Sequence, residues 1–136
     1  MTQNPVFVDT GAWIGLLNAD DECHAHFEAL FEELRLQKRP LVTTDWVLAE
    51  TGNGLARVRA RSRLSQMVIT FVQSPNCDLV RVDTGIFHRA LELYDSVSDK
   101  TWGMVDCASF VVMRDAQILD AATPDQHFDQ AGFRRL

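Results

Sequence analysis

The sequence has only three cysteines, Cys23, Cys77 and Cys107, and no two of them form a CxxC pair. A small and odd number of cysteines excludes a disulfide framework and is typical of proteins from a reducing cytoplasm. No apolar run is long enough to cross a membrane. The start of the chain also lacks the basic segment and long apolar stretch of a secretory signal. We therefore expect a cytoplasmic protein that does not enter the membrane.

The chain is also poor in positive charge. Its 136 residues include 13 Lys and Arg against 19 Asp and Glu, which gives a formal net charge of −6. This balance argues against an avid, non-specific nucleic-acid binder, although an acidic metal site would itself raise the negative count. Apolar residues make up 46% of the chain, enough to build a core and to exclude disorder. We expect one domain over residues 1–136.

Short apolar runs alternate with longer amphipathic ones along the chain. This alternation predicts an α/β fold with a parallel sheet of four to five strands, flanked by helices on both faces. In such folds ligands bind beyond the carboxyl ends of the strands, so residues that end strands are site candidates. Strands are predicted at residues 5–8, 41–43, 79–82, 117–119 and, at the edge, 132–136. Helices are predicted at 10–17, 21–37, 62–73, 83–97, from after 103 to about 115, and for one turn in 124–130. A further helix is capped at 44 or 45, runs through Glu50 and is interrupted in its middle by Gly52 and Gly54.

Four acidic residues fall where such a site would form. Asp9 ends the first predicted strand, and Asp125 follows the fourth. Asp106 lies in the first turn of a helix with an otherwise apolar character, and Glu50 lies among largely apolar neighbours in another helix. Each has a simpler alternative role. Asp9 and Asp125 could cap a helix or turn, Asp106 could interact with the helix dipole, and Glu50 could face solvent.

As a set, the four acids suit a divalent cation. Mg²⁺ is usually held by a few carboxylates together with water and substrate phosphate. Without a cation, clustered carboxylates repel one another and their pKa values rise. A metal ion in such a site activates water and stabilises the transition state of phosphoryl transfer. The pattern thus favours phosphodiester chemistry.

With these segments the chain resembles the PIN-domain family, and in particular the VapC-type toxins of bacterial toxin–antitoxin pairs. The resemblance spans nearly the whole chain in a coherent order, and its third segment is quite specific. The matching segments are FVDTGAW at residues 7–13, VLAET at 47–51, DKTWGMVDCASF at 99–110, TPDQHF at 123–128 and GF at 132–133.

The resemblance implies a PIN-like fold and an Mg²⁺- or Mn²⁺-dependent endoribonuclease. It also implies an RNA substrate, a cognate antitoxin protein and, commonly, a homodimer. Asp9, Glu50 and Asp106 match the core acids of the family and Asp125 matches the fourth, so these four are candidates for metal binding and catalysis. We hypothesise that metal-activated water attacks the RNA phosphodiester and leaves a 3′-hydroxyl and a 5′-phosphate, with no side-chain nucleophile.

Other residues of the matching segments are candidates for supporting roles. Thr10 and Thr123 match hydroxyl positions beside the acids, and Asp99 is a candidate metal ligand or a partner of the ligands. Relatives usually have Ser where this chain has Gly103, so a capping or water-binding hydroxyl is missing here. His127 is interpreted as a surface or packing residue.

A basic stretch offsets the acidic total locally. Arg57, Arg59, Arg61 and Arg63 bring four positive charges into seven residues. They are candidates for contact with RNA phosphates. A solvated helix face, or contact with an acidic segment of an antitoxin, are the alternatives.

Other functions stay open at this point. A PIN domain could process RNA without being a toxin, or could serve only for binding. From a different class, a receiver-like signalling domain would have a similar layout and would be phosphorylated at Asp83, after the third predicted strand. A receiver needs an acid pair at the end of its first strand, however, and Val8 precedes Asp9. A haloacid-dehalogenase-like phosphatase would need an Asp where Gly11 stands. The sequence does not select one RNA target.

Overall fold

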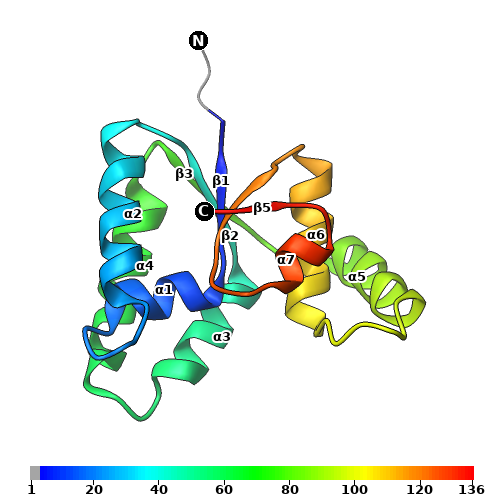
Figure 1. Cartoon of the computed structure of the whole chain (residues 1–136), viewed down its shortest axis with the longest axis horizontal. Coiled ribbons are helices and arrows are strands. Elements are labelled where there is room, and N and C mark those ends of the chain that lie inside the picture. The colour runs from blue at the N-terminus through cyan, green and yellow to red at the C-terminus, as the bar shows by residue number, and fades with distance from the viewer. Residues whose placement is uncertain (1–3) are drawn as a thin grey trace.

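Strands and helices alternate along the computed structural model, which describes residues 4–136 (Figure 1). The strands form one sheet in the order β3-β2-β1-β4-β5, and every neighbouring pair is parallel. The predicted α/β fold with a parallel sheet is therefore confirmed. The strands are β1 (Val6–Val8), β2 (Leu41–Thr44), β3 (Cys77–Val80), β4 (Asp120–Ala122) and β5 (Arg134–Arg135).

Helices cover both faces of the sheet, as predicted. In Figure 1, α1, α2 and α4 lie to the left of the strands, and α5, α6 and α7 lie to their right. No helix within residues 4–136 is long and apolar enough to cross a bilayer. The helices are α1 (Thr10–Leu17), α2 (His24–Leu36), α3 (Asp45–Leu55), the 3₁₀ helix η1 (Arg59–Arg63), α4 (Leu64–Gln73), α5 (Thr84–Ser96), α6 (Met104–Asp115) and α7 (His127–Gln130).

The strand predicted at residues 117–119 lies three residues later, in β4. Gln117 has a φ of 56°, a left-handed conformation that ends α6. The amide of Ile118 then donates to the carbonyl of Met113 at 2.8 Å, which closes the helix end. The run around Ile118 is thus a turn, and the strand follows in the less apolar segment Asp120–Ala122.

Two other predicted boundaries also move. β3 covers Cys77–Val80 rather than residues 79–82, so Asp83 does not end the strand. Instead, the Asp83 carboxylate caps α5 by accepting a hydrogen bond from the amide of Ile86 at 2.9 Å. The helix predicted at 62–73 begins as α4 at Leu64, after η1. Residues 1–3 lie outside the described residues. They belong to the predicted single domain of residues 1–136 and to the segment that we searched for a secretory signal.

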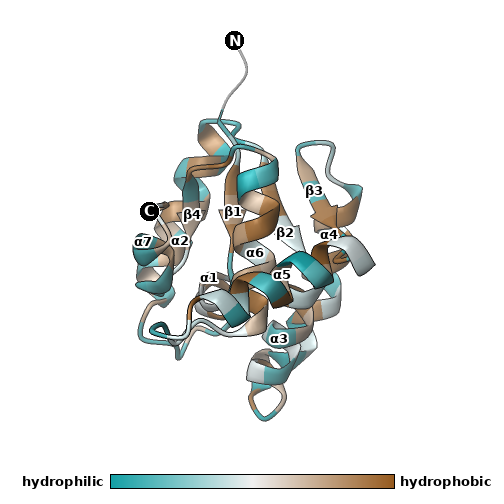
Figure 2. Cartoon of the chain, turned by 90° about the vertical axis from the view of Figure 1, so that its right-hand side faces the viewer, coloured by the Kyte–Doolittle hydropathy of each residue, from teal (hydrophilic) through white to brown (hydrophobic). Residues whose placement is uncertain are grey.

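The core lies around β1 and α6. All three residues of β1 are buried, because the strand lies between β2 and β4 and helices cover both faces of the sheet. Figure 2 shows the same pattern, with β1 and much of α6 coloured as hydrophobic. A buried aromatic cluster fills the space beside α6, with the ring of Phe110 at 5.0 Å from those of both Trp102 and Phe128. This packing fixes the carboxyl edge of the sheet, where β1 leads into α1 and β4 leads toward α7.

Candidate active site

Asp9 follows β1 directly and is nearly enclosed, with only 5% of its surface exposed. Its Oδ2 accepts a hydrogen bond of 2.9 Å from the hydroxyl of Thr123, which follows β4. Burial raises the pKa of Asp9 to about 7; hydrogen bonds from the Thr10 amide and the Thr123 hydroxyl oppose this rise, while the charges of Asp106 and Glu50 add to it. The structure therefore holds a buried carboxyl group beside two further acids.

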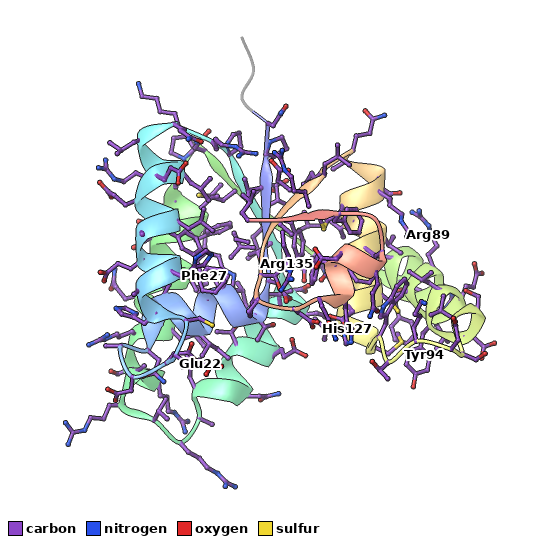
Figure 3. The ribbon with its side chains drawn as sticks, in the orientation of Figure 1. Glu22, Phe27, Arg89, Tyr94, His127 and Arg135 are labelled. Carbon is purple, nitrogen blue, oxygen red and sulfur yellow. The ribbon has the colours of Figure 1, made fainter. Side chains whose placement is uncertain are left out.

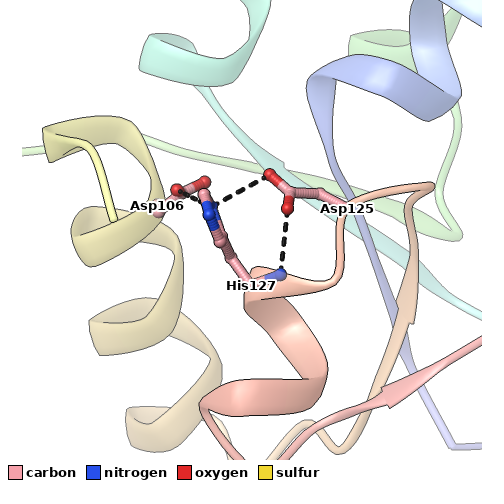
Figure 4. Close-up of side chains that lie close together, drawn as sticks. All are labelled: Asp106, Asp125 and His127. Atoms are coloured by element: carbon pink, nitrogen blue, oxygen red, sulfur yellow. Dashed lines mark hydrogen bonds and ion pairs between the residues drawn. The ribbon is translucent and has the colours of Figure 1, made fainter. Parts of the chain in front are cut away.

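Asp106, Asp125 and His127 form a second group at the same edge (Figure 4). The His127 ring lies between the two acids, with Nδ1 at 2.9 Å from Asp106 Oδ2 and 3.3 Å from Asp125 Oδ2. The Asp125 carboxylate also accepts a hydrogen bond of 2.9 Å from the amide of His127. The three side chains offer ligand atoms that all lie within 4.8 Å of one another.

Asp106 is partly buried in the first turn of α6. Burial raises its pKa, whereas hydrogen bonds with His127 and with the amide of Gly103 lower it, and the charge of Asp125 raises it. The Gly103 amide donates to Asp106 Oδ2 at 3.2 Å. Gly103 itself is the N-cap of α6 and has no side chain to supply a capping hydroxyl. The carboxylate of Asp106 therefore takes over one free amide of the helix start.

Glu50 reaches the site from α3. Its Oε1 accepts a hydrogen bond of 2.5 Å from the hydroxyl of Thr10, the residue after Asp9. Glu50 is exposed, but its charge acts on Asp9 and raises the pKa of that buried group. Thr10 thus connects α1 with α3 and orients the Glu50 carboxylate.

The structure brings the four predicted acids together. The charges of Asp106 and Glu50 act on Asp9, and the charge of Asp125 acts on Asp106. The donors are carboxylate oxygens, which hard divalent cations prefer. A cation would also offset the repulsion between the carboxylates. By the chemistry of these donors, the site fits Mg²⁺ or Mn²⁺.

Thr10 and Thr123 contact the cluster as predicted hydroxyl positions, whereas Asp99 and the basic stretch have other partners. Asp99 has an exposed side chain whose partner is Lys100, with 3.4 Å between Oδ2 and Nζ. In the basic stretch, Arg61 and Arg63 donate to the backbone carbonyls of Ala56 and Leu17. Arg57 and Arg59 are exposed.

The interpretation of His127 as a surface or packing residue is wrong. Its ring is enclosed by the two acids on one side, and its Nε2 lies 3.0 Å from the hydroxyl of Thr101 on the other. A sequence signal for this role exists in the spacing Asp125-x-His127. A carboxylate that accepts the amide of the residue two positions later turns the backbone there, and the imidazole then points back to the acids.

A parallel α/β sheet with four acids near its carboxyl edge is the arrangement expected for a PIN domain. Residues 6–134 match the PIN domain family, and the chain belongs to that family. The chain is similar to the 23S rRNA-specific endonuclease VapC20 of Mycobacterium tuberculosis. The two are 32% identical over 129 residues, which cover 94% of this chain and 95% of VapC20. The crystal structure of VapC20, described as a sarcin–ricin loop cleaving toxin, superimposes with a TM-score of 0.81 at 28% identity and covers 95% of this chain and 96% of that chain.

Two more distant structures share the fold. VapBC2 from Rickettsia felis, bound to a DNA fragment from its promoter, gives a TM-score of 0.67 at 12% identity over 97% of both chains. FitAB bound to the IR36 DNA fragment gives a TM-score of 0.67 at 14% identity, covering 96% of this chain and 93% of that chain. The resemblance to VapC-type PIN domains is therefore confirmed.

Proposed function

We propose that this protein is a metal-dependent endoribonuclease, the toxin of a VapBC-type toxin–antitoxin pair. The observation that carries the proposal is the buried Asp9 carboxyl, surrounded by the charges of Asp106 and Glu50 and joined through Thr123 to Asp125. The similarity to VapC20 over nearly the whole chain supports an endonuclease that acts on RNA. We propose Asp9, Glu50, Asp106 and Asp125 as the residues that hold the metal.

Each residue has a role in holding that cation. Asp9 and Asp106 would hold the metal with the more buried carboxylates. Glu50 from α3 and Asp125 from the loop after β4 would provide the other two carboxylates. Thr10 and Thr123 orient two of these carboxylates by the hydrogen bonds described above. When bound, Mg²⁺ or Mn²⁺ lowers the pKa of coordinated water and stabilises the transition state of phosphoryl transfer.

The substrate that we propose is RNA with an accessible backbone. Hydrolysis by water leaves a 3′-hydroxyl and a 5′-phosphate without a covalent intermediate on the protein. Ribosomal RNA is the first target to test, because VapC20 is named for 23S rRNA. The Arg57 and Arg59 side chains are exposed and remain our candidates for contacts with RNA phosphates, or with an acidic segment of the antitoxin.

The protein partners that we propose are those that the family resemblance implies. We propose a cognate antitoxin protein and a homodimer, since VapC-type toxins pair with antitoxins and are commonly dimeric. Size-exclusion chromatography with light scattering would test the dimer directly. Co-expression with the product of a neighbouring small open reading frame would test the antitoxin.

The decisive experiment is cleavage of ribosomal RNA by the purified protein in Mg²⁺ or Mn²⁺. We expect cleavage that stops in EDTA and in the Asp9→Asn variant. Asp20→Asn is a matched control, because Asp20 is an exposed acid in the loop after α1. A folded protein that cleaves equally well in EDTA would contradict the proposal of metal dependence. A folded protein that leaves ribosomal, messenger and transfer RNA intact in both metals would contradict the proposed activity.

A further inference from the structure

A hollow lies next to the acids, between the end of α5 and the start of α6. It has a volume of about 420 Å³, within the range of small-molecule sites. Tyr94 and Val97 line it from the α5 side, and Trp102 and Gly103 line it from the α6 side. Tyr94 is 48% exposed, whereas Trp102 is only 7% exposed. One aromatic side chain is thus available to a ligand while the other forms a fixed wall.

Two contacts join this hollow to the acid cluster. Thr101 lines the hollow, and its hydroxyl lies 3.0 Å from Nε2 of His127. The opposite ring nitrogen of His127 lies 2.9 Å from Asp106. Gly103 also lines the hollow and donates its amide to Asp106. In Figure 3, Tyr94 and His127 lie on the same lower right side of the molecule.

The charges around the hollow do not favour an anion. Lys100 is the only cation among its lining residues, and the acid Asp95 lines it too. The Lys100 ammonium also lies 3.4 Å from the exposed Asp99 carboxylate. The Gly103 amide is already used by Asp106. The charges near the hollow are therefore balanced or slightly negative, which disfavours a phosphate. A neutral ring with polar edges suits the hollow better, because it can stack on an aromatic side chain and form hydrogen bonds.

We propose that this hollow binds an unstacked nucleobase of the RNA, next to the phosphate that is cleaved, with the base stacked on Tyr94. The inference rests on the proposed ribonuclease function and adds a binding site for one neighbouring nucleotide. Nucleobases stack on exposed aromatic side chains in single-stranded RNA sites, and every base has a face for such stacking. Asp95, Ser98 and Lys100 provide acceptors and donors for the edges of the base.

The test uses the fact that the chain has a single tyrosine. Protein labelled with ¹³C only at the ε positions of its tyrosine ring gives one ring signal, which belongs to Tyr94. We would titrate it with a short single-stranded RNA of mixed sequence in Ca²⁺, and confirm on a gel that the RNA stays intact. We expect the signal to move to saturation with the RNA. An RNA of the same length with abasic positions should bind through its backbone and move the signal much less.

Variants provide the second measurement. We expect Tyr94→Ala to weaken RNA binding by roughly tenfold, as for loss of one stacked base, while Tyr94→Phe keeps the affinity. Leu91→Ala is the matched control, because Leu91 is 46% exposed on the same helix and does not line the hollow. Circular dichroism would confirm that every variant is folded.

The outcomes separate this inference from the proposed function. If wild-type protein cleaves RNA in Mg²⁺ but the Tyr94 signal stays fixed at saturating RNA, the base site is wrong and the ribonuclease proposal stands. If the signal moves with protein concentration alone and not with RNA, Tyr94 lies in a protein contact and the base site is again wrong. If no RNA is bound or cleaved, both proposals fail.

Discussion

The hydroxyl of Thr123 donates to Asp9 Oδ2 at 2.9 Å, across 114 residues of sequence. The hydroxyl oxygen of Thr123 also accepts a hydrogen bond of 3.0 Å from the amide of Asp125. One side chain therefore connects the acid that follows β1 with the acid that follows β4. Because a hydroxyl can donate and accept at once, this contact orients the first carboxylate and shapes the loop that carries the second.

Replacing Thr123 tests this connection. Thr123→Val keeps the shape but removes both hydrogen bonds, and we expect metal affinity and RNA cleavage to fall by roughly 10- to 100-fold. Thr123→Ser retains the hydroxyl and should keep most of the activity. Metal titration followed by a cleavage assay measures both effects. Equal activity of the Val and Ser variants would show that the hydroxyl is not needed.

The raised pKa of Asp9 predicts a pH-dependent stability. Its value of about 7 in the folded protein lies above the value near 3.9 of an unfolded Asp. Between these values the folded state binds more protons, so stability falls as pH rises. In EDTA, Asp9→Asn should therefore stabilise the protein near pH 8, by on the order of 1–3 kcal/mol, and have little effect near pH 4. Thermal unfolding at both pH values measures this, and an equal shift at both would contradict the burial effect.

Metal binding should stabilise the folded protein. At a concentration 100-fold above its dissociation constant, Mg²⁺ or Mn²⁺ would add about 2.7 kcal/mol to the free energy of unfolding. We expect EDTA to reverse the gain and Asp106→Asn to reduce it strongly. The gain should also shrink below about pH 7, where protons compete for Asp9. Differential scanning fluorimetry with and without metal, at several pH values, measures these changes in melting temperature. A melting temperature that does not change with either metal would contradict the proposed metal site.

The backbone at Gly11 leaves no room for a side chain. A Cβ at this position would lie 2.5 Å from Pro124 Cγ and 2.6 Å from Pro124 Cδ. We expect Gly11→Ala to displace the loop before Asp125, to cost about 1–3 kcal/mol of stability and to reduce cleavage. Gly85→Ala is the control, because a Cβ there would have its nearest contact at 3.4 Å, to Asp83 Oδ1, and Gly85 does not line the hollow beside the acids. Chemical denaturation and cleavage assays of both variants would show the contrast; equal effects would contradict it.

A buried ion pair holds the opposite end of β4. Asp120 is 4% exposed and binds Arg39 at 2.6 Å and Arg134 of β5 at 2.8 Å. Burial raises the pKa of Asp120, but hydrogen bonds with the two arginines outweigh it and lower the pKa overall. This stabilisation is present above about pH 4 and is lost as pH falls further.

Loss of this pair should destabilise the protein at neutral pH. We expect Asp120→Ala to cost about 3 kcal/mol, because buried Arg39 would lose its counter-charge. Asp115→Ala removes the partner of Arg89 in a half-exposed pair and should change stability little. Urea unfolding at pH 7 compares the two variants. A small effect of Asp120→Ala would mean that solvent replaces the lost carboxylate.

The sequence predicted the α/β class and closely predicted the strands β1 and β2, because buried parallel strands read as short apolar runs. It placed the fourth strand wrongly for the same reason. Ile118 is apolar and buried but lies in a turn, whereas β4 contains an Asp and two alanines. The Asp is tolerated in a buried strand because Arg39 and Arg134 neutralise it. Both arginines are distant in sequence, so no local pattern could reveal them.

The positions of the candidate site residues could be predicted where an acid follows a strand, and not where side chains from distant segments meet. Asp9 and Asp125 follow strands, and motif order pointed to Glu50 and Asp106. The role of His127 depends on the direction of its ring relative to Asp106, 21 residues earlier. The hollow that we propose as a base site depends on how the ends of α5 and α6 meet, and a sequence pattern does not contain that geometry.

The position of β1 between β2 and β4 has a consequence for how the protein is made. Asp9 is synthesised 114 residues before Thr123, whose hydroxyl orients it. It is also synthesised before β4, which pairs with β1, and before Asp125, the last of the four acids. A nascent chain on the ribosome can form β1–β2 pairing long before β4 has emerged. A chain that has not yet been extended past Asp125 would lack part of the proposed metal site, so we expect the topology to delay the proposed cleavage activity until β4 and the loop after it have been made.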